Sequence, residues 1–172
     1  MNVPSVVYEG VYGPYTVTSE HRREVLAYRL SLLLVALAQV ALLVQWRQFG
    51  PSLCWPWLLL MAAGLGGALR WVHIYLVPLH RALQLFWLLG CAGFGLLAYR
   101  AGAAAMLPQL VEQPVWVWLV GPFFAALAGL GFKEFFCFQR PEAIGLTLVL
   151  PVLLLGWWLG LWPELVAAVL LA

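Results

Sequence analysis

The stretch AYRLSLLLVALAQVALLVQW, residues 27–46, decides the fold of this chain. It is apolar almost throughout and carries a single charge, at Arg29. About 20 such residues in a helix cross the roughly 30 Å hydrocarbon core of a bilayer. Polar and apolar residues do not alternate along the stretch, and a helix satisfies its own backbone hydrogen bonds in lipid. We therefore expect a transmembrane helix.

Four later stretches have the same length and character, so the sequence predicts an all-α, polytopic transmembrane helix bundle with five spans. The predicted spans are residues 27–46, 55–76, 82–99, 115–136 and 143–162. Residues 1–26 are predicted to form a cytoplasmic N-terminal segment, and residues 27–172 the transmembrane helical domain. The bilayer is thus the first expected partner of the chain.

Composition supports this interpretation and excludes other classes. Of the 172 residues, 65% are hydrophobic and 9% charged, with a mean hydropathy of +0.94, whereas about a quarter of the residues in a soluble protein are charged. The net charge of +2 comes without a basic run, which argues against nucleic-acid binding. Residues 1–18 lack the features of a cleaved signal peptide, so the first span is expected to act as an uncleaved insertion signal.

The basic residues predict which way the bundle faces. Seven fall on the side of the N-terminus and two on the other, and by the positive-inside rule this places the N-terminus in the cytoplasm. Eight of the ten tryptophans gather at the face that is poor in charge, and Trp71 and Trp87 are the exceptions. The seven inner basic residues are Arg22, Arg23, Arg29, Arg70, Arg81, Lys133 and Arg140, and the two outer ones are Arg47 and Arg100.

Two apolar segments are too short to cross the bilayer. Residues 163–172 would form a helix of about 15 Å, so we expect it to lie at the interface or to re-enter the membrane, with a sixth crossing as the alternative. Residues 101–113 are expected to lie on the outer face.

Small residues at helical spacing predict close helix contacts, in the pairs Gly64 with Ala68, Ala125 with Gly129, and Gly156 with Gly160. Pro122 and Pro151 lie inside the fourth and fifth spans and are expected to kink them. Such kinks line a cavity in some bundles and are inert in others.

Residues able to do chemistry concentrate at the inner ends of the second and fourth spans, and they form the candidate binding cluster. Charged residues there lie somewhat inside the interface, where they need a partner or must reach towards water. We expect Arg70 to pair with Glu134. The cluster comprises Arg70, His73, His80, Arg81, Lys133, Glu134, Cys137, Arg140 and Glu142.

Cys137 and the two histidines of this cluster each allow a chemical role and a purely structural one. Lys133 lies four residues from Cys137 and could lower its thiol pKa, but Cys137 also fits a small buried hydrophobe. His73 and His80 could ligate a metal or haem, or they could hydrogen-bond locally at the interface. Neither a metal site nor a catalytic residue is assigned, and the cofactor stays open.

Three stretches together resemble an uncharacterised integral membrane protein family of cyanobacteria and plastids. They are Tyr12-Gly13-Pro14-Tyr15-Thr16 with Arg22-Arg23-Glu24, Trp71-Val72-His73-Ile74-Tyr75 with Pro78-Leu79-His80-Arg81-Ala82-Leu83-Gln84, and Phe132-Lys133-Glu134-Phe135-Phe136-Cys137-Phe138. The resemblance implies a photosynthetic membrane setting, so the plasma or thylakoid membrane is expected, and it implies no assigned activity.

Three functions follow as hypotheses. The first is a non-enzymatic accessory, assembly or stabilising subunit of a membrane complex, with other membrane proteins or a second copy as partner. The second is a passive channel or carrier for a small solute or anion, drawn from the two prolines and the basic inner cluster. The third is a membrane enzyme or cofactor binder that uses the His, Glu and Cys residues of the cluster.

Overall fold

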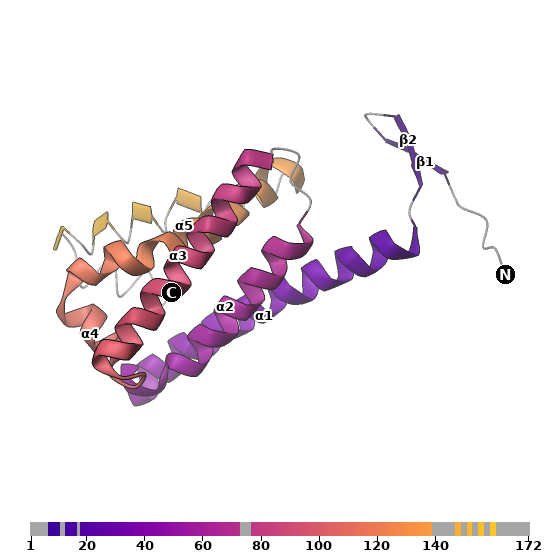
Figure 1. Ribbon diagram of the computed structural model, residues 1–172. Coiled ribbons are helices and arrows are strands. Elements are labelled where there is room, and N and C mark those ends of the chain that lie inside the picture. The colour runs from indigo at the N-terminus through magenta and orange to yellow at the C-terminus, as the bar shows by residue number, and fades with distance from the viewer. Residues whose placement is uncertain are drawn as a thin grey trace.

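A computed structural model describes residues 7–10, 13–16, 18–72 and 77–138, and in the C-terminal part residues 147–148, 151–152, 155–156 and 159–160. For residues 7–8, 10, 13–16 and 136–138 it describes the backbone alone. Figure 1 shows the arrangement of the helices along the chain.

The N-terminal segment contains a small antiparallel hairpin that the all-α prediction did not include. Strand β1 (Val7–Gly10) pairs with β2 (Gly13–Thr16), and Tyr8 lies opposite Tyr15 in the register. β-Branched and aromatic residues favour extended backbone, and this segment lies outside the apolar stretches. The helical prediction therefore applies to the membrane domain and does not extend to these residues.

Helix α1 (Ser19–Phe49) is the longest described helix, at 31 residues. Thr18 caps its first turn, because its side chain accepts a hydrogen bond from the backbone N–H of His21 at 3.2 Å. The helix therefore begins eight residues before the predicted start of the first span, inside the predicted N-terminal segment 1–26. It ends at Gly50, whose φ of 79° places it in the left-handed region.

The other helices follow the predicted spans closely. They are a short 3₁₀ turn η1 (Pro51–Leu53), then α2 (Trp55–Trp71), α3 (Val77–Ala101), the seven-residue α4 (Met106–Glu112), a second 3₁₀ turn η2 (Pro114–Trp116), and α5 (Val117–Phe138). Helix α4 is too short to cross a bilayer, as predicted, and it packs against η1 at the end of the bundle that holds Trp46 and Trp55. Helix α5 runs on through Pro122.

The bundle is built from two helix pairs. Helix α1 packs along α2 and α3 packs along α5, whereas α2 and α3 touch over a shorter length. The contact between the pairs includes Trp87 of α3, whose indole N–H donates to the backbone carbonyl of Ala62 at 2.9 Å. This interior role explains why Trp87 departs from the interfacial pattern of the other tryptophans.

Glycines let both pairs approach closely. A Cβ on Gly93 would lie 2.2 Å from the carbonyl oxygen of Leu119, and one on Gly90 would lie 2.4 Å from the backbone nitrogen of Phe123. A Cβ on Gly64 would lie 2.9 Å from the side chain of Val35. The predicted close contact at Gly64 is therefore confirmed, while Gly90 and Gly93 make the closer α3–α5 contact.

In the other two predicted pairs of small residues, one member packs closely and the other does not. Gly129 packs against Leu83 of α3, although its predicted companion Ala125 is exposed. Gly156 is buried, but the expected packing at Gly160 is wrong: its φ is +66° and no described atom lies within 4 Å of a Cβ built there. Gly160 serves as a turn residue after a short helical stretch, because only glycine adopts this conformation without strain.

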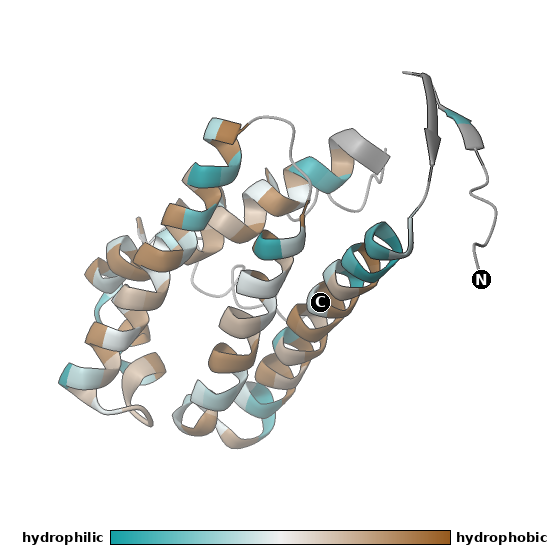
Figure 2. Ribbon diagram, turned by 45° about the vertical axis from the view of Figure 1, so that its right-hand side comes forward, coloured by the Kyte–Doolittle hydropathy of each residue, from teal (hydrophilic) through white to brown (hydrophobic). Residues whose placement is uncertain are grey.

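Hydropathy along the helices matches a membrane bundle. Figure 2 shows apolar residues along the middle of the helices and hydrophilic ones towards their ends. Three described helical segments are long and apolar enough to cross a membrane: α1, α3, and η2 together with α5. Helix α2 has 17 residues and is shorter, and the predicted fifth span, 143–162, lies largely outside the described residues.

Candidate functional site

A polar contact joins α1 to α5 at the end of the bundle where α1 begins, which we call the inner end. The hydroxyl of Tyr28, which is 8% exposed, donates a hydrogen bond to the carboxylate of Glu134. The ammonium of Lys133 lies 2.9 Å from the same carboxylate oxygen and 4.9 Å from the centre of the Tyr28 ring. A half-buried carboxylate needs such partners, since burial removes the water that would stabilise its charge. The three side chains thus fasten the two helix pairs to each other.

A second polar contact joins α3 to α2 at the same end. The Nε2 atom of His80 lies 2.7 Å from the backbone carbonyl of Leu69, and the amide of Gln84 lies 3.2 Å from the same nitrogen. A carbonyl oxygen only accepts, so Nε2 carries the hydrogen. His80 is therefore used in helix packing, which agrees with the local hydrogen-bonding interpretation.

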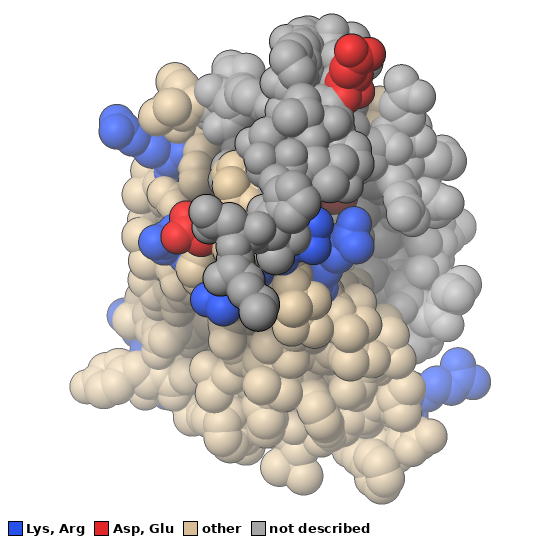
Figure 3. All heavy atoms as spheres, turned by 90° about the vertical axis from the view of Figure 1, so that its right-hand side faces the viewer, with Lys and Arg blue, Asp and Glu red and all other residues tan. Residues whose placement is uncertain are grey.

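Two arginines of the cluster take no part in these contacts among the described residues. Arg70 and Arg81 are exposed, and the guanidinium of Arg70 lies over the ring of Trp71, 5.0 Å from its centre. The expected pairing of Arg70 with Glu134 is not seen among the described residues, because Tyr28 and Lys133 occupy that carboxylate. Figure 3, which views the molecule from the N-terminal side of α1, shows several Lys and Arg side chains spread over this face.

The remaining members of the predicted cluster are only partly covered by the structure. His73, Arg140 and Glu142 lie outside the described residues, and so does the side chain of Cys137. Among the described residues, no three His, Cys, Asp or Glu side chains come together as a metal ion would require. The structure thus brings Lys133 and Glu134 together and places His80, Arg70 and Arg81 at neighbouring helix ends.

Tyr28 was missed by the sequence reasoning, although it is the residue that α1 contributes to the inner contact. A tyrosine near the end of a transmembrane helix usually fits an interfacial belt, so nothing in its own position marks it as buried. The available signal was Glu134 itself, because a carboxylate at that depth requires a donor from a neighbouring helix.

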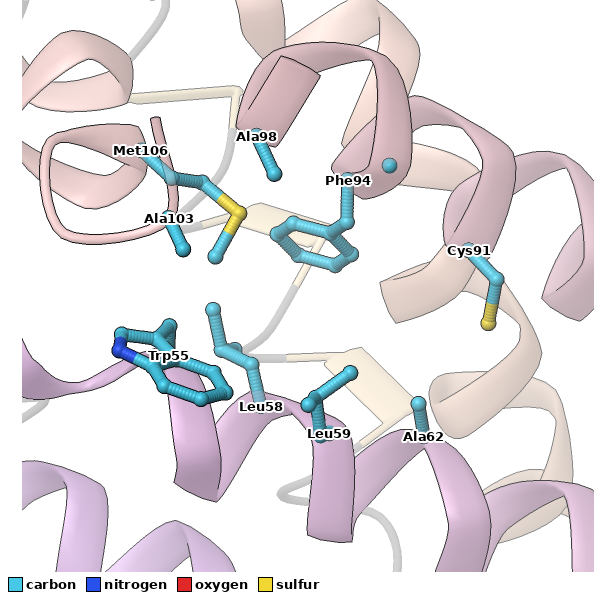
Figure 4. Close-up of a pocket in the computed structure, with 10 residues that line it drawn as sticks. Trp55, Leu58, Leu59, Ala62, Cys91, Phe94, Ala98, Ala103 and Met106 are labelled. Atoms are coloured by element: carbon cyan, nitrogen blue, oxygen red, sulfur yellow. The ribbon is translucent and has the colours of Figure 1, made fainter. Parts of the chain in front are cut away.

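An apolar cavity of about 310 Å³, partly open to the surface, lies between the two helix pairs nearer the other end of the bundle. Figure 4 shows Leu58 and Trp55 of α2 facing Phe94 of α3, with Met106 of α4 at one side. Its lining is Trp55, Leu58, Leu59, Ala62, Cys91, Phe94, Gly95, Ala98, Ala103 and Met106. This lining offers almost no polar surface, so the cavity fits a hydrocarbon group and has no charged side chain to bind an ion.

The outer face of α1 carries a continuous apolar stripe, which we call the α1 stripe. Its six residues follow one another at intervals of four and three, each is Leu or Val, and each is about half exposed. Exposed faces of helices repeat at such intervals, but here every position is a large aliphatic residue. The α1 stripe consists of Leu26, Leu30, Leu33, Leu37, Val40 and Val44.

Comparison with known proteins places the chain in a family. The family model described as "Uncharacterized integral membrane protein (DUF2301)" matches residues 67–172, which is more than half of the chain. The matched part contains α3, α5 and all nine residues of the candidate cluster, among them Arg70, His80 and Glu134. No curated protein and no solved structure matches the chain. The chain therefore belongs to this family of uncharacterised integral membrane proteins.

Proposed function

We propose that the protein is a non-enzymatic accessory subunit that assembles or stabilises a larger membrane complex. The observation that carries the proposal is the α1 stripe on the longest helix of the bundle. Helix α1 buries 17% of the apolar window that would cross the membrane, against 22% for α3 and 39% for the segment containing α5. A helix held to its own bundle on one side has the rest of its surface free for another transmembrane helix.

The residues that flank the α1 stripe indicate the kind of partner. Arg23 precedes Leu26 by three residues and Arg47 follows Val44 by three, so the same spacing places an exposed arginine at each end. Two copies of α1 in one membrane would run parallel and bring like charges together at both ends. The stripe therefore fits a transmembrane helix of a different protein, with an aliphatic seam and acidic residues near its ends.

The contacts in the inner cluster give less support to the other two functions. Glu134 and His80 hold helices together through Tyr28 and Leu69, which leaves them a packing role. The cavity between the helix pairs is apolar, whereas a channel for ions or small polar solutes is lined by polar groups. Both functions rank behind an accessory role on these grounds.

The same proposal includes the topology and the setting. Helix α2 would cross the membrane as a fourth span and residues 143–162 as a fifth, with the N-terminus in the cytoplasm. The hydrogen bond from the Thr147 hydroxyl to the Ala128 carbonyl, 3.3 Å long, supports a fifth segment that packs on α5. For the setting we propose a photosynthetic membrane, on the resemblance of residues 12–24, 71–84 and 132–138.

Purification of the tagged protein in a mild detergent tests the proposal. We expect the wild-type chain to migrate in a complex with a defined membrane partner. Replacing Leu30, Leu33 and Leu37 by Ala shortens the α1 stripe without adding a polar group, and should reduce the co-purified partner about tenfold.

A matched control replaces three leucines of similar exposure on α3, Leu85, Leu88 and Leu89, by Ala. We expect this control to keep the partner. An equal loss from both variants would overturn the role of α1, and a wild-type protein that runs alone, as a monomer or as a homodimer, would contradict the proposed function.

A further inference from the structure

The arginines on α1 and α3 mark the two surfaces of the membrane. Arg29 and Arg47 are 18 residues apart on α1, a rise of about 27 Å, and Arg81 and Arg100 are 19 residues apart on α3, about 28 Å. Both separations match the roughly 30 Å thickness of a hydrocarbon core. Arg29 and Arg81 therefore lie at the depth of the lipid headgroups at the inner end of the bundle.

Contacts between the helices place Arg70 at the same level. A Cβ on Gly67 would lie 2.7 Å from the hydroxyl of Ser31, so these two residues are level on the antiparallel pair α1 and α2. Three residues nearer the inner end, α1 carries Tyr28 and α2 carries Arg70, so these two residues are also level with each other. The contact of His80 with Leu69 at 2.7 Å similarly brings the start of α3, with Arg81, to the end of α2.

The charge at this end is strongly positive. Five exposed arginines lie there, against the acidic residues Glu20, which is exposed, and Glu24, which is partly exposed, while the carboxylate of Glu134 is engaged by Lys133 and Tyr28. Three of the arginines, Arg29, Arg70 and Arg81, occupy the headgroup level, and we call them the arginine belt. Arg22 and Arg23 follow about 10 Å further out along α1.

The preference for arginine over lysine in this chain also indicates a phosphate ligand. Eight of the nine basic residues of the chain are arginine, and the single lysine, Lys133, is used inside the bundle. A guanidinium presents its N–H donors as a planar fork that matches two phosphate oxygens, whereas an ammonium acts as a point charge. The guanidinium of Arg70 also lies over the ring of Trp71, 5.0 Å from its centre, and this attraction helps to hold it at the level of that ring.

We propose that the arginine belt binds the phosphate of anionic phospholipid headgroups in the inner leaflet. The lipids lie alongside the bundle, with their phosphates at the level of the exposed guanidinium groups and their acyl chains against the apolar surface of the helices. Each basic residue near an anionic membrane surface contributes about 1 kcal/mol to such attraction. Three together are enough to select an anionic lipid over a zwitterionic one.

Full-length protein in nanodiscs provides the test. Native mass spectrometry of protein released from discs of phosphatidylglycerol mixed with phosphatidylcholine should show retained phosphatidylglycerol, at an occupancy well above that of phosphatidylcholine. The triple variant Arg29→Gln, Arg70→Gln and Arg81→Gln should lower that occupancy about tenfold. The matched control Arg47→Gln with Arg100→Gln removes arginine from the other end and should change occupancy less than twofold.

Each result decides the proposal. Equal retention of both lipids by the wild-type chain, or equal losses in the triple variant and the control, would overturn it. Inorganic phosphate at millimolar concentration should not displace the lipid, and displacement would show a site for free phosphate instead. If the triple variant does not fold in phosphatidylcholine discs, the three single variants are measured, and an unchanged occupancy in all three would also overturn the proposal.

Discussion

Tyr28 and Glu134 show how one hydrogen bond can organise a membrane bundle. The two residues lie 106 positions apart in the sequence, on helices that belong to different pairs. In lipid the hydrophobic effect does little to hold helices together, so packing and polar contacts between helices gain weight. The contact therefore holds α1 near α5 at the inner end, where Lys133 balances the carboxylate.

Replacing Tyr28 by Phe should destabilise the protein while keeping its shape. The change removes one hydroxyl and leaves the carboxylate of Glu134 without one of its donors, at a cost of about 1–2 kcal/mol. Unfolding in mixed micelles with increasing SDS would measure this loss. In a double-mutant cycle with Glu134→Gln, the effects should be less than additive, and full additivity would show that the two side chains are not coupled.

Cys54 should be an unreactive thiol. It is fully buried, its Sγ lies 3.6 Å from the carbonyl oxygen of Gly50, and burial raises the pKa of its thiol above the usual 9.0. Because the thiolate is the reactive form, a raised pKa keeps the group protonated, and its labelling should increase only as the pH rises beyond the usual thiol range.

Maleimide labelling of single-cysteine proteins at pH 8 checks this expectation. The matched control carries Ser52→Cys with Cys54 replaced by Ala, because residue 52 is exposed and lies two positions away. The control should label at least about tenfold faster. Similar rates for the two proteins would contradict the burial of Cys54.

At the scale of elements, apolar length predicted the helices well and their ends less well. Four predicted spans overlap α1, α2, α3 and α5, because each needs a long apolar stretch whatever its neighbours are. Helix α1 begins earlier than predicted because the charged residues from Glu20 to Arg23 are compatible with a helix that continues into the headgroup region. Hydropathy alone marks where lipid begins and does not mark where a helix ends.

Close packing of α3 against α5 gives a sharp test at this scale. Replacing Gly93 by Ala would place a methyl group 2.2 Å from the carbonyl oxygen of Leu119 and force the two helices apart, at a cost of about 1–3 kcal/mol. The same replacement at Gly95, which has no described atom within 4 Å of a Cβ, should stabilise α3 by up to about 1 kcal/mol. Unfolding of both variants in SDS should show shifts of opposite sign, and equal destabilisation would contradict the packing of the Gly93 face of α3 against α5.

At the scale of the whole molecule, the sequence revealed which residues gather at the inner end but not how they are paired. Charge and depth singled out Arg70, His80 and Glu134 from their positions near span ends. The partner of each depends on which helices lie side by side, and that follows from glycine contacts such as Gly90 with Phe123, whose positions hydropathy does not encode. Glu134 therefore bonds to Tyr28 in the structure, and not to Arg70 as the sequence predicted.

The cavity between the helix pairs follows from this architecture. Contacts at Trp87 and at the inner end hold the pairs together, and the space between Leu58 and Phe94 is left without side chains to fill it. An unfilled space between helices forfeits contacts, so filling it with apolar atoms should stabilise the protein. The effect tests whether the two pairs are held at a fixed distance.

Replacing Ala98 by Leu adds three carbons to the wall of the cavity and should raise the stability by about 0.5–2 kcal/mol. Unfolding in SDS measures the change, and Ala92→Leu on the exposed side of α3 is the matched control, with no cavity to fill. A stabilisation confined to Ala98→Leu would show that the pairs keep their separation in the membrane. If both variants behave alike, the pairs close on each other and the cavity does not persist.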